Sequence, residues 1–169
     1  MTVARTPVVV GAGILAAGFA AAGAVLLATA PAGSGAAAHN EAVVNAQATA
    51  RVIGQVDTGL QRVLSYRYAD PAATHAAATQ VLTGDAARQY EVLFKALQQK
   101  AGSEQLTLTA KIVAAGVETL EGDHAQLLVF LDQSSTRASD GTTSTSAAQL
   151  RIAAVRRGGV WRISELVPL

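Results

Sequence analysis

Asp132 is the residue whose type and position best suit acid–base chemistry in this sequence. It ends the run "LLVFLD", residues 127–132, and shares one face of that predicted strand with Leu128 and Phe130. A carboxyl group that projects into an apolar cavity has a raised pKa, which suits it to act as a general base. Alternatively, Asp132 ends the strand and helps the chain to turn. No companion acid, base or oxyanion donor stands at a recognisable spacing, so we expect no catalytic site.

The histidines, serines and cysteines predict no metal, cofactor or nucleophile site. His39, His75 and His124 have none of the spacings that hold a metal ion, and no G-x-S-x-G elbow occurs. The sequence contains no cysteine, which excludes disulfides, cysteine metal sites and a lipid anchor on cysteine. We therefore expect no bound metal, no cofactor and no enzyme activity.

Two tyrosines in the segment "SYRYAD" are candidates for the mouth of a cavity. Tyr66 and Tyr68 lie between two predicted helices, just before Asp70. Tyrosines in such positions also pack their rings against a core while the hydroxyl bonds to a turn. We take Tyr66, Tyr68 and Asp132 as the residues that could line a cavity mouth.

A glycine pattern near the amino terminus has two interpretations. Gly11, Gly13 and Ala16 fit G-x-G-x-x-[GA], the turn that holds the pyrophosphate of a dinucleotide. That fold needs an acidic residue about 20 positions further on, whereas the next acidic residue here is Glu41. The same residues begin Val8–Ala28, an almost wholly apolar run. Because about 20 helical residues cross a bilayer, the membrane interpretation explains more of the pattern.

Residues 8–30 are therefore predicted to form a transmembrane signal-anchor helix. A cleaved signal peptide, with a cleavage site at residues 36–38, is the alternative, but its apolar core would be shorter. Arg5 precedes the helix, and the next Lys or Arg is Arg51. By the positive-inside rule, residues 1–7 form a short cytoplasmic tail and the rest of the chain lies outside. This predicts a single-pass protein of the cell membrane, in contact with the lipid bilayer.

The predicted anchor carries small side chains at every fourth position. Residues at this spacing stack along one side of a helix. In lipid, a row of small residues lets a second helix approach closely. The candidate partner contacts are Ala12, Ala16, Ala20, Ala24 and Ala28.

Charge and aromatic content argue against a nucleic-acid partner. The chain has 13 Lys and Arg against 12 Asp and Glu, a net charge of +1, so it lacks the basic surface such a partner requires. Aromatic residues make up 4% of the chain, too few for a surface that stacks on bases.

Residues 31–39 are predicted to be a linker, and residues 40–169 an exterior domain long enough to form a core. Apolar residues recur at steps of three and four in its first half, as in amphipathic helices. Asn40 and Asp70 suit N-caps, and Pro71 suits a first turn. The expected helices, with approximate ends, are residues 40–63, 71–82 and 85–101.

In the second half of the domain, apolar and polar residues alternate along the chain, which is typical of strands. The second predicted strand is apolar on both faces, so it is the central strand or something covers its outer face. The Ser/Thr-rich residues 134–146 form either a polar loop or a long hairpin tip. The four expected strands are residues 106–112, 125–132 and 148–154, and one that begins at Trp161.

Three helices followed by a four-stranded antiparallel meander predict the α+β class, with the helices on one face of the sheet. A curved sheet that wraps around helices makes a cone. In element order, this domain resembles the nuclear-transport-factor-2-like fold.

Several short segments of the domain resemble a known membrane-protein family. With one anchor helix in front, residues 40–169 closely resemble the actinobacterial Mce-associated membrane proteins, which accompany mammalian-cell-entry (Mce) lipid importers. The resemblance implies a single-pass accessory subunit that stabilises a lipid or sterol import complex. Its partners would be an Mce permease or sister Mce-associated subunits, in a homo- or hetero-oligomer, and it implies no catalytic residues. The matching segments are Ser65-Tyr66, Tyr68-Ala69-Asp70, Leu82-Thr83-Gly84, Leu128-Val129-Phe130, Asp132-Gln133 and Trp161-Arg162-Ile163.

Two other functions remain open. One anchor helix followed by an exterior cone domain also occurs in scaffold subunits of type IV secretion and conjugation machines. The remaining alternative is a lipid-binding cup or a ketosteroid-isomerase-like enzyme, with Asp132 as its base.

Overall fold

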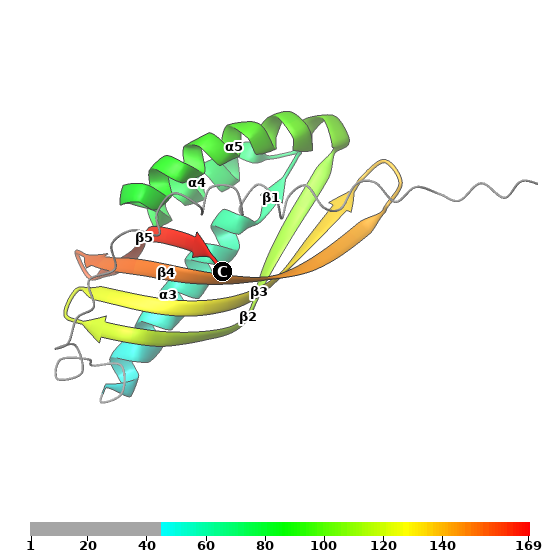
Figure 1. Ribbon diagram of the computed structural model, residues 1–169. Helices are drawn as coiled ribbons and strands as arrows, with labels where there is room; N and C mark the ends of the chain where they lie inside the picture. Colours follow the sequence, from blue (N-terminus) through cyan, green and yellow to red (C-terminus); the bar gives the residue numbers. More distant parts are fainter. Residues whose placement is uncertain (1–44) are drawn as a thin grey trace, which may run out of the picture.

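A computed structural model of the chain describes residues 45–169 (Figure 1). The predicted anchor and linker lie outside this range. No helix of residues 45–169 is both long enough and apolar enough to cross a membrane. The elements in chain order are α3 (Ala46–Leu64), β1 (Tyr66–Arg67), α4 (Pro71–Val81), α5 (Gly84–Glu104), β2 (Leu106–Glu121), β3 (His124–Arg137), β4 (Thr143–Arg157) and β5 (Val160–Pro168).

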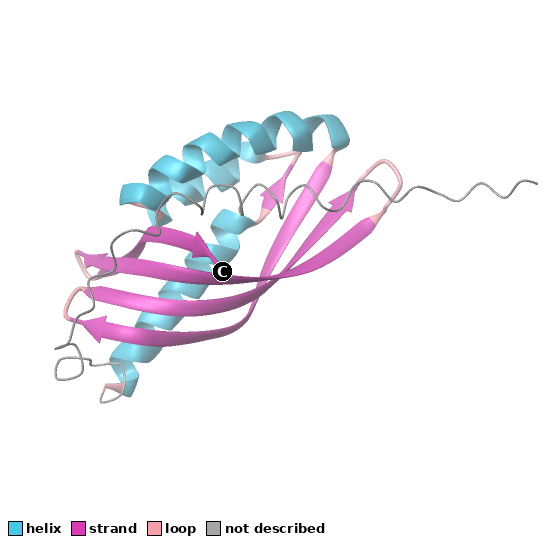
Figure 2. Ribbon diagram, viewed as in Figure 1, coloured by secondary structure: helices cyan, strands magenta, loops and turns pink. Residues whose placement is uncertain are grey.

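The five strands form one sheet in the order β1-β2-β3-β4-β5, and every neighbouring pair is antiparallel. The sheet curls, and α3 runs across it (Figure 2). The helix α4 packs against both α3 and α5. The predicted α+β class, with three helices against a curled antiparallel sheet, is confirmed. The expected count of four strands is wrong, because Tyr66–Arg67 pairs with β2 as a fifth. Two residues are too few to show alternation, so the sequence could not reveal this strand.

The helix ends follow from local capping. Asp70 accepts a hydrogen bond of 3.1 Å from the N–H of Ala73, and Pro71 stands in the first turn of α4, as predicted. The N-cap of α3 is Asn45, whose side chain accepts from the N–H of Ala48 at 2.9 Å. Asn40, the expected cap, lies outside the described residues.

The strands are longer than the sequence pattern suggested. β2 continues to Glu121, because register shifts between Ile112 and Ala114 and between Val117 and Thr119 interrupt its alternation without ending it. The Ser/Thr-rich segment is a long hairpin rather than a loop, since β3 and β4 pair without a register shift as far as Thr136 and Thr143.

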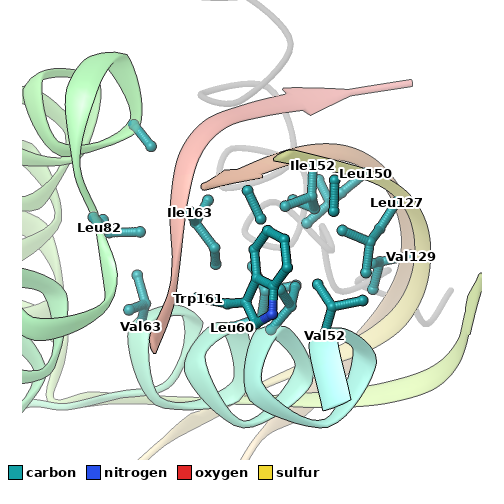
Figure 3. Close-up of a cluster of buried hydrophobic side chains, with 14 of the residues drawn as sticks. Val52, Leu60, Val63, Leu82, Leu127, Val129, Leu150, Ile152, Trp161 and Ile163 are labelled. Carbon is teal, nitrogen blue, oxygen red and sulfur yellow. The ribbon is translucent and has the colours of Figure 1, made fainter. Parts of the chain in front are cut away.

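The core lies between α3 and the concave face of the sheet (Figure 3). The apolar stripe of α3 shares this core with side chains of β3, which is the central strand of the sheet, one of the two arrangements expected for it. Full burial of a Val or Leu side chain contributes about 1.5–3 kcal/mol. The fully buried large side chains are Val52, Val56, Leu60, Leu120, Leu127, Val129, Leu131, Ile152 and Ile163.

Candidate functional site

Asp132 lies on the sheet face opposite the core. Along β3, Leu127, Val129 and Leu131 are buried, so the alternate residues point outward. Asp132 is exposed and stands opposite Lys111 in the register of β2 and β3. Its carboxylate is therefore in contact with water and does not enter the apolar interior.

The two candidate tyrosines occupy different environments. Tyr66 is 3% exposed, and its ring meets that of Phe94 edge to face, with centroids 6.1 Å apart. Tyr68 is 37% exposed. Tyr66 lines an open hollow of about 380 Å³ between α3, α4, β1 and β2, which Asp70 also lines. Neither Tyr68 nor Asp132 lines this hollow.

The polar groups that line this hollow hold neighbouring elements together. Thr74 donates from Oγ1 to the carbonyl of Ser65 at 3.0 Å, and Ser65 accepts at Oγ from the N–H of Ala110 at 3.1 Å. Arg62 donates to Gln80 at 3.3 Å, and Asp70 caps α4. These groups already have structural partners, so the arrangement fixes the junction of α3, α4 and β2 and offers no evident catalytic set.

Two buried polar atoms were not anticipated as site features. The Tyr90 hydroxyl has no hydrogen-bond partner among residues 45–169, and its ring stacks on Phe94 at 5.2 Å. Burial, with a smaller effect from Glu91, raises the pKa of Tyr90 well above its usual range, so the hydroxyl keeps its proton. The helical spacing of Tyr90, Leu93, Phe94 and Leu97 signalled only that this ring faces inward.

The second such atom is Oδ1 of Asp57 on α3, which is buried and lacks a hydrogen-bond partner in the described part of the chain. Burial raises the pKa of this carboxyl above its usual value. Residues 45–169 contain no group of three or more histidine, cysteine or acidic residues that could hold a metal ion.

The outer face of the sheet mixes apolar and charged side chains. Leu128 and Phe130 are half-buried there. Arg151 on β4 reaches Glu118 on β2 at 3.4 Å, and this ion pair therefore crosses the central strand.

No family model matches the chain. Two proteins of Mycobacterium tuberculosis, the uncharacterized proteins MT1407 and Rv1362c, are each 32% identical to it over 95 residues. The match covers 56% of this chain and 43% of each relative, so the chain spans less than half of their length.

Solved structures share the arrangement of the described domain. An IcmL-like type IV secretion system protein of Legionella pneumophila superposes with a TM-score of 0.60 at 10% identity, covering 71% of this chain and 92% of that one. A periplasmic fragment of TraM gives 0.55 at 10% identity, with 69% and 93% covered. A nuclear-transport-factor-2-like protein of Salmonella enterica gives 0.50 at 15% identity, with 71% and 91% covered. The fold is nuclear-transport-factor-2-like. At these identities the likeness extends to the fold alone.

Proposed function

We propose that this chain is a membrane-anchored, non-catalytic accessory subunit that stabilises an Mce-type lipid or sterol import complex. The observation that carries the non-catalytic part is the orientation of β3. Its core-facing side chains Leu127, Val129 and Leu131 are apolar and pack against α3, whereas Asp132 points to the opposite side. A scaffold works through its surface, and this orientation of β3 supports such a role.

The attachment of this scaffold to its complex has two parts. Residues 8–30 anchor the chain in the cell membrane, with residues 1–7 in the cytoplasm and the domain outside. The row of alanines from Ala12 to Ala28 docks on a permease helix or on a sister subunit. Both parts lie outside the described residues. The subunit needs no metal, cofactor or nucleic acid for this role.

The choice of an Mce complex rests on the resemblance of short segments such as Leu82-Thr83-Gly84 and Trp161-Arg162-Ile163 to actinobacterial Mce-associated proteins. Relatives in Mycobacterium tuberculosis support an actinobacterial setting for the chain.

A second function is favoured by the solved structures. Two of the similar folds, with TM-scores of 0.60 and 0.55, are those of an IcmL-like type IV secretion system protein and a periplasmic fragment of TraM. We therefore keep a scaffold subunit of a type IV secretion-like machine as the alternative.

Co-purification separates the two functions. The tagged full chain is expressed in its own host, the membranes are solubilised in mild detergent, and the bound proteins are identified by mass spectrometry. We expect Mce subunits and their permease, with the same recovery for Asp132→Asn. Recovery of a conjugation or secretion ATPase instead would replace the first function by the second.

A further inference from the structure

The sheet has two edge regions that are protected against pairing with another chain. The edge of β2 carries two β-bulges and the charged residues Lys111, Glu118 and Glu121, which are features that discourage strand addition. The edge of β5 is covered by the junction of α4 and α5, where the N–H of Thr83 donates to the carbonyl of Ile163 at 2.8 Å.

A third edge region lacks such protection. The last bond between the two carboxyl-terminal strands runs from the N–H of Leu169 to the carbonyl of Gln149, at 3.0 Å. β4 extends beyond this point as far as Thr143, well past the end of β5 (Figure 1). Within residues 45–169, the segment Thr143–Ala148 pairs only with β3 and has no backbone partner on its other side.

The composition of this open edge permits strand addition. Residues 143–148 read "TSTSAA", with no charge and no proline, and their register with β3 has no shift. The exposed edges of native sheets are usually blocked by a charged residue, a proline or a β-bulge. Because the backbone of Gln149 faces β5, the alternate residues Ala147, Thr145 and Thr143 direct their N–H and C=O groups to the open side.

The hairpin arm that carries this edge is held in position by α5. Arg137, at the end of β3, forms ion pairs of 3.3 Å with Glu104 and 3.4 Å with Asp140. The N–H of Ala138 donates to the carbonyl of Gln105 at 3.1 Å. A strand that is already ordered loses less conformational entropy when another strand pairs with it.

We propose that this open edge pairs antiparallel with the same edge of a second copy, with Thr145 opposite Thr145 of that copy. In this register Thr143 faces Ala147 of the second copy, and all three outward-facing residues find partners, giving about six backbone hydrogen bonds. The two sheets then continue into each other across a two-fold axis.

Three features favour a second copy over an unrelated strand. The open stretch is centred on Thr145 and is bounded by the hairpin turn at one end and by β5 at the other, so two copies fill each other's edge fully. The edge carries no charge, so it does not repel itself when it pairs with its own copy. A second copy also brings Ser144 opposite Ser146, a pair that is favoured across antiparallel strands. The inference holds whichever complex the chain serves.

Cysteine cross-linking in membranes that contain the full chain tests this pairing, because the natural sequence has no cysteine. In the proposed register the two Cα atoms of residue 145 are about 5.5 Å apart, within the range of about 4.4–6.8 Å that a disulfide requires. We expect Thr145→Cys to give a disulfide-linked dimer on mild oxidation. Thr136→Cys is the matched control, because Thr136 lies on β3 of the same arm, about 20 Å from its copy: three strand spacings separate the two β3 strands, and the two residues are offset by four positions along them.

Charge exchange provides the second arm of the test. Thr145 is exposed, so neither Thr145→Lys nor Thr145→Glu should alter the fold. Each variant alone should lose the dimer in detergent, and an equal mixture of the two should recover it. The inference is overturned if Thr145→Cys gives no dimer, if Thr136→Cys cross-links equally, if Thr145→Cys joins another protein instead, or if the charged variants stay dimeric.

Discussion

The side-chain oxygen of Gln55 accepts a hydrogen bond of 2.8 Å from the backbone N–H of Trp161. This contact joins the first described helix to the last strand, 106 positions further along the chain. It fixes α3 against the edge of the sheet at the place where Trp161 covers the core.

Replacing Gln55 with Leu should destabilise the domain. The N–H of Trp161 would lose its partner in a partly buried position, which costs about 1–3 kcal/mol. Denaturant unfolding of the purified chain measures the change. Gln61→Leu is the control, since Gln61 is exposed on the same helix and should change stability by less than about 0.5 kcal/mol. Equal effects of the two variants would show that the contact does not stabilise the domain.

Gly59 and Gly54 on α3 should respond in opposite ways to alanine. A Cβ atom at Gly59 would lie 2.7 Å from Cγ1 of Val81, whereas one at Gly54 would meet nothing within 4 Å. Gly59→Ala should destabilise the domain by about 1–3 kcal/mol through overpacking against α4. Gly54→Ala should stabilise it by up to about 1 kcal/mol, because alanine favours a helix interior. Thermal unfolding of both variants checks this, and a stabilising Gly59→Ala would contradict the close packing of α3 and α4.

Asp57→Asn should stabilise the domain at neutral pH. Burial raises the pKa of Asp57 above its usual value of 3.8, so the folded state holds a charge that it disfavours. The stability gained by the variant should be present at pH 7 and shrink as the pH falls through the raised pKa. It should vanish below about 3.8, where the carboxyl is protonated in both states. The difference in melting temperature between wild type and variant, followed from pH 7 to pH 4, tests this. A difference that is independent of pH would contradict it.

The alanine row of the predicted anchor should be required for partner binding. Replacing Ala16, Ala20 and Ala24 with Leu preserves hydrophobicity but prevents close approach of a second helix. Co-purification of partner proteins should fall while the amount of this chain in the membrane is unchanged. Three leucines on the opposite side of the helix are the control, and an equal loss there would leave the exterior domain as the sole contact.

Local signals in the sequence predicted the helices well, because helix capping and the three- and four-residue spacing of apolar side chains depend only on neighbouring residues. The start of α4 is marked by the capping side chain of Asp70 and by the ring of Pro71 in the first turn. The length of β2 could not be predicted in the same way, since its bulges after Ile112 and Val117 break the alternation that identifies a strand. The Ser/Thr-rich arm has little hydrophobic pattern, and its strands are joined by the backbone ladder and by polar pairs such as Thr136 with Thr143 at 3.0 Å.

The location of Asp132 illustrates why the site was harder to predict than the fold. The sequence correctly grouped Asp132 with Leu128 and Phe130 on one face of its strand. Because residues 127–131 are apolar throughout, the pattern could not tell which face is the core. Only the packing of α3 against Leu127, Val129 and Leu131 decides this, and it leaves Asp132 in water.

Uptake of a labelled sterol and of a labelled fatty acid by a host strain that lacks this chain tests the central claim most directly. We expect uptake to fall in this strain and to be restored equally by the wild-type chain and by Asp132→Asn, because a scaffold needs no reactive carboxylate. Unchanged uptake of both lipids in the deletion strain would contradict a role in lipid import. Restoration by wild type but not by Asp132→Asn, at equal protein levels, would contradict the non-catalytic account.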